Sequence, residues 1–378
     1  MKPLTSHDLP TAMPTERLIN ELQSSGVRLA DPKSGATSRR GGAGPSDHAP
    51  ITIDGMTVMV PIHNAPAFDS PYTIDRPDAS GASRVRRDGV ELGTVSFPPR
   101  PRFYELSTAD GIPYSKIATL HGRDVLATTV LQTCIRYESR TKSCRFCAIG
   151  QSLAAGRTIA RKTPAQLAEV ARAAVELDGV KHMVLTTGTP PGADRGAAVL
   201  ADSAAAIKAA VDLPIQGQCE PPDDDAWFAR MKAAGIDALG MHLEAVTEEV
   251  RRQVMPGKAQ VPLARYMAAF RAAVPVFGRN QVSTYILAGL GDRTEDILGV
   301  CEQLVEIGVY PFVVPFVPIA GTPLESHPSP SPDVMHGLLA RLAQMLGKAD
   351  LRATDIKAGC GRCGACSALA TYERGARR

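Results

Sequence analysis

Three cysteines in one short segment carry the strongest chemical signal in the sequence. Cys134, Cys144 and Cys147 lie in a turn-rich stretch that directly follows the apolar run from Val125 to Leu131. Three thiolates can hold a [4Fe–4S] cluster by three of its irons, which leaves the fourth iron without a protein ligand. Such an iron can bind and activate a small molecule. The spacing therefore predicts an iron–sulfur enzyme whose cluster lies at the mouth of an α/β barrel.

A second group of cysteines lies close to the end of the sequence. Cys360, Cys363 and Cys366 recur every third residue, and the glycines among them free the backbone to wrap around an ion or a cluster. A structural zinc ion needs four ligands, and no Cys or His nearby in the sequence supplies the fourth. We expect an auxiliary iron–sulfur cluster here, with zinc or a redox-labile tail as the alternatives. Cys219 and Cys301 are interpreted as small buried residues, although Cys219 is also a candidate ligand.

Composition and charge narrow the class of protein. The chain has 378 residues and a net charge of only +3, so no nucleic-acid partner is expected. We find no apolar run of the about 18 residues that a membrane span needs, and residues 1–12 lack the apolar core of a secretion signal. Six of the eight cysteines fall in two tight clusters, which favours ligands in a reducing cytosol over disulfides. We therefore expect a cytoplasmic protein.

From residue 120 onward, strand-like and helical patterns alternate. Strands are expected at 125–131, 182–187, 213–218, 236–243, 282–287 and 311–317, with helices at 163–177, 196–211, 224–234, 247–254, 263–273 and 294–307. Thr163 followed by Pro164 is typical of a helix N-cap and its first helical residue. Six strands joined by crossover helices predict a parallel sheet in an α/β, partial (β/α)6 TIM-like barrel.

The remaining sequence predicts three further regions around a barrel that spans residues 120–325. Residues 1–50 are expected to hold a helix at 14–25 and then a flexible linker. Residues 51–119 are expected to form a small β-rich module, because Asp54-Gly55 and Asp88-Gly89 each separate strand-like runs as hairpin turns do. Residues 326–378 combine a helix, at about 331–346, with the cysteine-rich segment.

Polar or glycine-rich segments follow all six predicted strands. Functional groups on a parallel sheet lie at the carboxyl ends of its strands, so these segments should share one mouth. Glu220 follows the third strand, and His242 and Glu244 share one face after the fourth. His242 is alternatively a core histidine bonded to backbone. The two carboxylates are costly to bury unless they bind something, which favours a site.

These features resemble the radical S-adenosylmethionine (SAM) superfamily over roughly residues 120–325. The resemblance rests on the three-cysteine loop after the first strand, on Phe146 before the last of those cysteines, and on the six-strand series. It implies a [4Fe–4S] cluster held by Cys134, Cys144 and Cys147, with SAM on the fourth iron. It also implies reductive cleavage of SAM to a 5′-deoxyadenosyl radical that abstracts hydrogen from a small-molecule substrate. An electron donor such as flavodoxin or ferredoxin would then be needed.

The resemblance also assigns residues to SAM. Phe146 would pack near the adenine, and Thr187-Gly188 stands where many members carry a Gly-Gly-Glu run that meets the methionine amino group. Glu244 resembles the acidic ribose contact of biotin and lipoyl synthases, with Glu220 and His242 as neighbouring candidates.

Two further stretches continue the resemblance. Gly289, Gly291 and Glu295 resemble the glycine motif beside the adenine. Residues 316–324 resemble the corresponding stretch of biotin synthase, in which an auxiliary cluster donates sulfur. A biotin synthase-like oxidoreductase or sulfurtransferase, with Cys360, Cys363 and Cys366 at the auxiliary cluster, is therefore the expected type.

Two departures from the family pattern stand out. Most members place three residues between the first two cysteines, whereas this chain places nine, and it lacks the acidic end of the Gly-Gly-Glu run. The basic residues of the longer loop either favour thiolates or simply keep the loop solvated; they are Arg136, Arg140, Lys142 and Arg145. The spacing is most similar to a little-characterised radical SAM family associated with nitrilase-type gene clusters.

The alternative to an enzyme is a non-catalytic metal- or redox-sensing protein on a barrel scaffold, with the C-terminal cysteines as the sensor. Glu244 and the glycines at the strand ends favour the enzyme, because a sensor needs no nucleotide-shaped pocket. The catalytic residues, the substrate and the product do not follow from the sequence.

Overall fold

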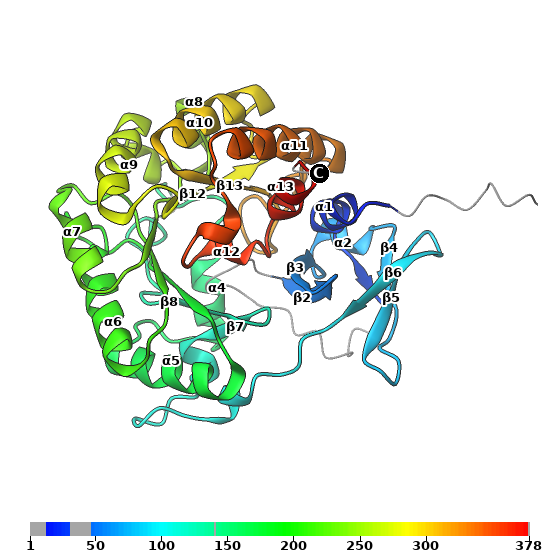
Figure 1. Ribbon diagram of the computed structural model, residues 1–378, viewed down its shortest axis with the longest axis horizontal. Coiled ribbons are helices and arrows are strands. Elements are labelled where there is room, and N and C mark those ends of the chain that lie inside the picture. The colour runs from blue at the N-terminus through cyan, green and yellow to red at the C-terminus, as the bar shows by residue number, and fades with distance from the viewer. Residues whose placement is uncertain (1–12, 31–46, 140, 377–378) are drawn as a thin grey trace, which may run out of the picture.

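The barrel is a seven-stranded sheet covered by helices on its outer side. A computed structural model describes residues 13–30, 47–139 and 141–376. The strand order is β13-β12-β11-β10-β9-β8-β7, and Figure 1 shows the sheet curled, with helices on its outer side. Its parallel strands are β8 (Val125–Thr129), β9 (His182–Thr186), β10 (Ile215–Gln218), β11 (Ala238–Gly240), β12 (Val282–Ala288) and β13 (Tyr310–Pro315).

The predicted partial barrel is confirmed, with one strand more than expected. The helices between strands are α5 (Pro164–Asp178), α6 (Ala197–Ala210), α7 (Ala226–Ala233), α8 (Glu248–Val254), α9 (Leu263–Phe277) and α10 (Thr294–Ile307). Two shorter elements, α4 (Ile149–Ala154) and η2 (Lys258–Gln260), lie near the sheet's carboxyl edge. The additional strand is β7 (Thr119–His121), which pairs antiparallel with β8 at the edge. Three residues are too few to show a strand period in the sequence.

Local signals explain the helix boundaries. Thr163 caps α5 through a reciprocal capping box with Gln166, and Pro164 occupies the first helical position. Gly179 ends the same helix in the left-handed conformation, at φ 66°. The strands of the barrel are buried along almost their whole length, as expected for parallel strands that are covered on both faces.

The N-terminal module is a second sheet, with strand order β1-β4-β5-β6-β2-β3. Its elements are α1 (Thr15–Ser25), β1 (Arg28–Leu29), β2 (His48–Ile53), β3 (Met56–Pro61), α2 (Ala65–Phe68), β4 (Tyr72–Ile74), β5 (Ala82–Arg87) and β6 (Val90–Ser96). Both predicted hairpins are present, and Asp54-Gly55 has positive φ at both turn residues. The segments η1 (Arg102–Glu105) and α3 (Tyr114–Ile117) connect this module to the barrel.

The predicted linker lies mostly outside the described residues, which resume at Asp47; Arg140 of the cysteine loop is also outside them. Strand β2 begins at His48, within the stretch expected to be linker.

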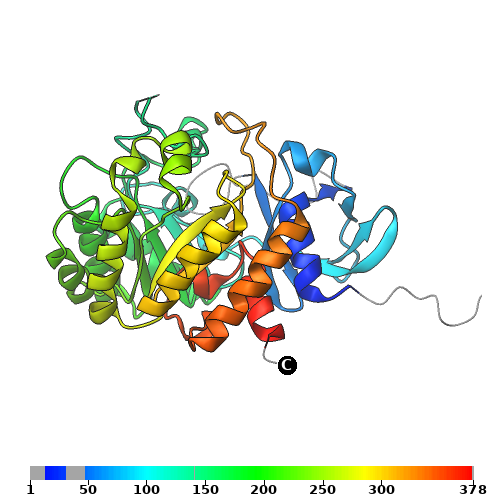
Figure 2. The same ribbon diagram turned by 90° about the horizontal axis from the view of Figure 1, so that it is seen from above.

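The C-terminal segment closes the open side of the barrel. It consists of α11 (Pro332–Lys348), η3 (Ala353–Asp355), α12 (Cys360–Cys363) and α13 (Leu369–Gly375). Figure 1 shows α12 between the barrel strands and the β2–β3 hairpin, and Figure 2 shows α11 between the barrel and the N-terminal module. One hydrophobic core runs through all three parts, from Leu22 and Ile51 through Leu126 to Leu339. The module and the tail are therefore packed as walls of the barrel.

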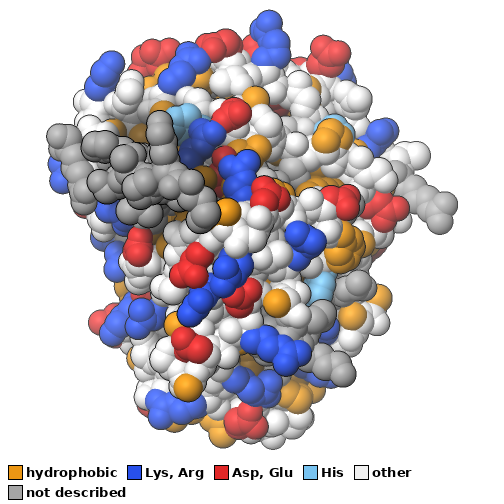
Figure 3. All heavy atoms as spheres, turned by 90° about the vertical axis from the view of Figure 1, so that its right-hand side faces the viewer, with side chains coloured by type: hydrophobic (Ala, Val, Ile, Leu, Met, Phe, Trp, Pro, Cys, Tyr) orange, Lys and Arg blue, Asp and Glu red, His pale blue; other side chains and the backbone are white. Residues whose placement is uncertain are grey.

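The outer face of the N-terminal module carries mixed charge. Figure 3 shows Lys and Arg side chains interspersed with Asp and Glu over the part of this face that is not grey. Among the helices of the described residues, none is both long enough and apolar enough to cross a membrane.

Candidate functional site

Both cysteine triads line a single cavity of about 400 Å³ inside the barrel. The first triad lies at the carboxyl ends of the strands and the second on the tail. The β2–β3 hairpin contributes His48 and Met59 to the same wall. The cavity is therefore built from all three parts of the chain, and a molecule within it would lie between two sets of thiols.

The first triad occupies the loop between β8 and α4. The thiols of Cys134, Cys144 and Cys147 are free, and burial raises the pKa of Cys147 to about 12, an effect that a hydrogen bond from the Ile149 backbone partly offsets. Burial first, and then the charge of Glu244, also hold the pKa of Cys144 well above its usual value. Three soft sulfur donors suit iron–sulfur ligation, and binding would release their protons. The residues present fit the predicted cluster.

Phe146 lies on the wall of this cavity, in an apolar cluster that does not belong to the main core. It packs with Cys144 against a group formed by Ala245, Val250, Val254, Met255, Leu290 and Phe316. This placement provides a flat apolar surface next to the triad, and the role of Phe146 beside an adenine stays a prediction.

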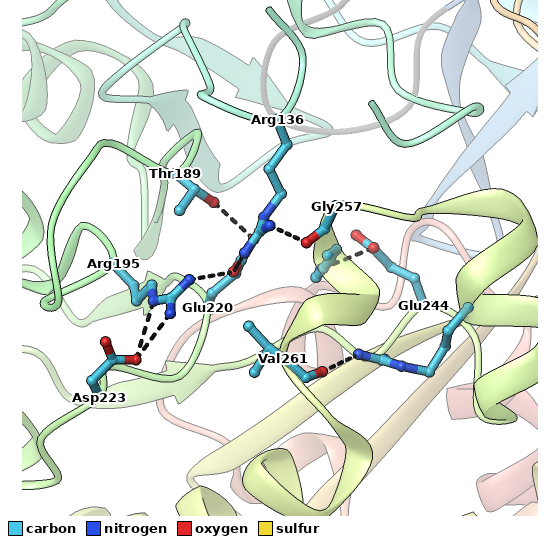
Figure 4. A network of polar contacts seen from close by, with 10 residues as sticks. Arg136, Thr189, Arg195, Glu220, Asp223, Glu244, Gly257 and Val261 are labelled. Atoms are coloured by element: carbon cyan, nitrogen blue, oxygen red, sulfur yellow. Dashed lines mark hydrogen bonds and ion pairs between the residues drawn. The ribbon is translucent and has the colours of Figure 1, made fainter. Parts of the chain in front are cut away.

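Arg136 anchors the long loop between the first two cysteines to the barrel. Its guanidinium donates two hydrogen bonds of 2.7 Å to the carboxylate of Glu220 and another to the Gly257 carbonyl (Figure 4). Arg195 approaches the same carboxylate at 3.7 Å, and Thr189 donates to it at 2.9 Å. Both partners of the main pair are about 6% exposed. The sequence offered two explanations for Arg136, stabilisation of thiolates and solvation of the loop. Neither anticipated that its charge would pair with the carboxylate of Glu220.

The charged groups around Glu220 keep it ionised. Burial alone would raise the pKa of Glu220, but hydrogen bonds from Arg136 and Thr189 and the charge of Lys258 hold it below its usual value. Glu220 therefore serves as a buried anchor for the cysteine loop, and its carboxylate is fully engaged by the protein.

The cysteine loop also packs closely on the segment after α8. The Gly257 amide donates to the Lys142 carbonyl at 3.0 Å, and the Arg145 amide donates to Val254 at 2.8 Å. A Cβ atom on Gly257 would lie 2.4 Å from the Lys142 carbonyl oxygen. The loop backbone therefore rests directly on this glycine.

We expect Gly257→Ala to destabilise the protein by about 1–3 kcal/mol, because the new methyl group must displace backbone and has no flexible side chain to push aside. Urea unfolding measures the effect. Gly299→Ala is the matched control, since no atom lies within 4 Å of its added Cβ in α10. Equal stability of the two variants would mean that the loop does not rest on Gly257.

Glu244 and Lys258 form the second charged pair at the mouth. They are 2.9 Å apart, and both line the cavity. Glu244 has φ 64°, an uncommon conformation for a residue with a side chain, which its backbone bonds to Tyr285 and Leu287 maintain. Burial would lower the pKa of Lys258, but the charge of Glu244 holds it above its usual value. Glu244 thus lies on the cavity wall with Lys258 as its partner, and its contact with a ligand stays a prediction.

Three of the other predicted residues also line the cavity. A Cβ on Gly188 would lie 2.1 Å from the Thr133 carbonyl, so the end of β9 touches the residue before Cys134. His242 faces the cavity, while its Nδ1 accepts a hydrogen bond from the Tyr285 amide, and burial lowers its pKa to about 3. His242 thus faces the cavity, as a site residue would, and is also bonded to backbone, as a core histidine would be. Thr187 lines the cavity as well.

Three predicted residues are not brought to this cavity. Gly289 and Gly291 follow β12 with φ of 104° and 127°, so the turn itself requires glycine, and a Cβ on Gly289 would meet Pro330 at 2.8 Å. Glu295 lies on the exposed first turn of α10 and pairs with Arg341 of α11 at 2.9 Å. Helix α10 turns this side chain outward, which corrects its predicted place beside the adenine.

The second triad is held by strand β10 of the barrel and by the N-terminal module. Gln218 donates to the Cys360 sulfur at 3.1 Å, and Gln216 accepts from the Cys360 amide at 3.2 Å. The Ala365 carbonyl accepts hydrogen bonds from the Met59 amide at 2.7 Å and from Gln23 at 2.9 Å. In the described residues, no group of three His, Cys, Asp or Glu side chains is arranged around a single metal ion. The cysteine tail is thus fixed in place by β10 and β3.

Several lining residues were not predicted from the sequence. Lys258, Tyr285 and His121 join the cavity from η2, β12 and β7, and His48 with Met59 joins from the N-terminal module. Lys258 and His121 lacked any local motif. The period of two in β12 places Tyr285 on the same face as Leu287, which is a signal that could have identified it.

Comparison with known proteins identifies the superfamily of the barrel domain. Residues 141–304 match the profile of the radical SAM superfamily, a range that includes Cys144 and Cys147. The chain is 30% identical over 125 residues to a probable dual-specificity RNA methyltransferase RlmN from Moorella thermoacetica, covering 33% of this chain and 35% of that protein. It is 27% identical over 212 residues to bacteriochlorophyllide c C-7(1)-hydroxylase from Chlorobaculum limnaeum, covering 51% of this chain and 52% of that protein.

The chain thus spans about a third to a half of the curated relatives it matches. The crystal structure of methylornithine synthase (PylB) aligns with a TM-score of 0.47 at 19% identity, over 64% of this chain and 68% of that one. The biotin synthase-like type and the nitrilase-associated group stay predictions. What the profile establishes is broader: this chain contains a domain of the radical SAM superfamily.

Proposed function

We propose that this protein is an enzyme that cleaves SAM reductively and uses the product to abstract hydrogen from a small molecule in the barrel cavity. Cys134, Cys144 and Cys147 would hold the [4Fe–4S] cluster. When bound, that cluster and SAM supply a 5′-deoxyadenosyl radical, by transfer of one electron and cleavage of the carbon–sulfur bond, which also yields methionine. The electron would come from a donor such as flavodoxin or ferredoxin.

The protein's own residues would orient SAM and exclude water. Phe146 offers an apolar surface for the adenine, and Glu244 offers a carboxylate at the ribose, the role that the family resemblance assigns to it. Thr187 and Gly188 lie beside the cysteine loop, where the methionine end would be. The position of the triad on the wall of a cavity inside the barrel limits the entry of water, which protects a reactive radical from side reactions.

The observation that carries this proposal is the shared cavity. Two cysteine triads that are more than two hundred residues apart in the chain line the same space of about 400 Å³. A redox sensor does not require its sensing thiols to face a second thiol triad across a cavity. The sensing protein therefore becomes the second candidate, and it predicts labile metal without SAM cleavage.

The test is anaerobic reconstitution with iron and sulfide, followed by iron and sulfide counting and an assay for 5′-deoxyadenosine under reducing conditions with SAM. We expect iron and sulfide for two clusters, and 5′-deoxyadenosine that requires both SAM and reductant. Iron at both triads without any SAM cleavage would overturn the proposal and favour the sensor.

The second triad is proposed to hold an auxiliary iron–sulfur cluster. We expect Cys363→Ala to lose the iron of the second site while 5′-deoxyadenosine formation continues, because Cys134, Cys144 and Cys147 are unaltered. Iron counting and the 5′-deoxyadenosine assay measure this. Cys301→Ala is the control, since that buried thiol lies in the core of α10 and should retain all iron. If Cys363→Ala also stopped 5′-deoxyadenosine formation, the tail would be needed to support the first site.

Sulfur insertion is the reaction type that the resemblance to biotin synthase favours. If the auxiliary cluster donates sulfur, acid-labile sulfide must be consumed in step with 5′-deoxyadenosine when substrate is present. Unchanged sulfide over many turnovers would exclude sulfur insertion and leave electron transfer or substrate ligation as the role of the second site.

The similar proteins widen the range of candidate reactions and substrates. The chain is similar to an RNA methyltransferase and to a bacteriochlorophyllide hydroxylase, so methyl transfer and hydroxylation are further candidate reactions. The expected exclusion of nucleic acid rested on net charge, and net charge alone does not decide whether RNA is a substrate. The cavity of about 400 Å³ suits a small molecule or a single extruded group.

A further inference from the structure

A histidine from the far edge of the sheet meets the second cysteine triad. His121 is the last residue of β7, and its ring is buried, with 8% of the residue exposed. Its Nδ1 lies 3.7 Å from the Sγ atom of Cys363. More than two hundred and forty residues separate the two in the chain, which is why no fourth ligand could be recognised from the sequence.

The distance fits two ligands of the same metal ion. With metal–sulfur bonds of about 2.3 Å and metal–nitrogen bonds of about 2.0–2.1 Å, two tetrahedral ligands lie about 3.5 Å apart. The observed 3.7 Å is close to that value. A two-iron cluster divides four ligands into two such pairs, and His121 with Cys363 would form one of them.

The other polar groups at the triad are less suitable as ligands. Gln218 approaches the Cys360 sulfur through its amide nitrogen, which is a hydrogen-bond donor without a lone pair for a metal. Tyr285 forms a hydrogen bond with Cys366 and would have to lose its phenolic proton to bind. A neutral imidazole binds metals without losing a proton and is the commonest nitrogen ligand in proteins.

The surroundings hold the two groups toward each other. Hydrogen bonds from β10 and β3 fix the tail that carries Cys363. His121 is paired across the β7–β8 ladder with Val125, which packs with Cys363 in a small apolar cluster. His121 and Cys363 also line a second cavity of about 670 Å³.

We propose that His121 is the fourth protein ligand of the second site, which makes it a Cys3His site for an iron–sulfur cluster formed with Cys360, Cys363 and Cys366. The identity of the metal rests on the auxiliary cluster proposed above, whereas the role of His121 rests on the contact with Cys363. The site is asymmetric, since one of its irons would carry a nitrogen ligand. Nitrogen in place of sulfur raises the reduction potential of such a cluster.

The test uses the full chain, reconstituted with iron and sulfide and reduced in the absence of SAM, so that no SAM nitrogen can reach the first cluster. Pulsed electron paramagnetic resonance should show coupling to an imidazole nitrogen in the wild type. His121→Ala should lose that coupling and should lose the second site's iron to a chelator at least about tenfold faster. His121→Cys should keep the iron, lose the coupling and lower the reduction potential.

His182 provides the matched control. Its Nδ1 accepts a hydrogen bond from the Gly359 amide at 3.3 Å, so it lies beside the same tail with its nitrogen already engaged. His182→Gln should keep the nitrogen coupling. Coupling that is absent from the wild type, or that survives in His121→Ala, would overturn the assignment.

The metal itself separates this inference from the proposed function. Zinc at the second site, in place of iron and sulfide, would refute the auxiliary cluster. His121 would then be judged by zinc retention, which should fall in His121→Ala and not in His182→Gln. Iron and sulfide with no effect of any His121 substitution would refute the ligand and keep the cluster.

Discussion

Replacing Cys147 by alanine should abolish 5′-deoxyadenosine formation from SAM. This thiol is half-buried and lies with Cys134 and Cys144 on the cavity wall, and two remaining sulfur ligands cannot fix a cube with one iron directed at the cavity. Even removal of an outer-sphere partner of a metal ligand can cost about 10–100-fold. Loss of a direct ligand should therefore lower the rate by more than about 100-fold. The measurement is 5′-deoxyadenosine per protein after anaerobic reconstitution, together with iron content.

The control for Cys147 is Cys219, a buried thiol that lines the same cavity at the end of β10. Cys219→Ala should retain the iron of both sites and most SAM cleavage. Equal loss in the two variants would make Cys219 a ligand and would contradict the three-cysteine assignment. SAM cleavage that persists in Cys147→Ala would remove the basis of the proposed reaction.

Replacing Arg136 by methionine should give the largest loss of stability among single changes near the site. The variant leaves the Glu220 carboxylate buried with its main partner removed, and breaking a buried ion pair in this way costs about 3–5 kcal/mol. Arg195, at 3.7 Å, remains as a weaker partner and favours the lower end of that range. Urea unfolding of the purified protein measures the change. Arg145→Met, an exposed arginine of the same loop, should have little effect.

Two further measurements isolate the pair. In a double-mutant cycle, Glu220→Gln should recover part of the loss caused by Arg136→Met, since a neutral amide needs no counter-charge. The pKa of Glu220 is below its usual value in the folded protein, so the stabilisation is present above the unfolded-state pKa, about 4.3. It is lost as the pH falls through the folded-state pKa. The difference between wild type and Arg136→Met should therefore shrink below about pH 4. A difference that does not change with pH would contradict this account.

The order of the elements could be predicted from the sequence because local patterns determine it. Alternating apolar runs placed the parallel strands of the barrel, and Thr163-Pro164 marked the start of α5 to within one residue. The two Asp-Gly hairpins were equally visible, since each turn requires positive φ at successive residues. Strand β7 was missed because three residues carry no periodic signal.

The contacts of the site were harder to predict from the sequence, because each joins residues that are far apart in the chain. Arg136 and Glu220 are separated by 84 positions, and nothing local distinguishes a pairing arginine from a solvated one. The family resemblance placed Glu295 at the nucleotide, but α10 turns this residue outward toward Arg341. Similarity of motif thus located the cavity, whereas packing decided which residues face it.

The hydrogen bonds from Met59 and Gln23 to the Ala365 carbonyl have a consequence for the order of assembly. All the strands of the barrel and the whole N-terminal module precede residue 360 in the chain, so they leave the ribosome before the last three cysteines do. If the barrel folds before the tail docks against β3, the cavity lacks that wall, and iron and sulfide would reach the first triad from that side. Docking of the tail then completes the wall that carries Cys360, Cys363 and Cys366, so the two proposed clusters would be filled in sequence.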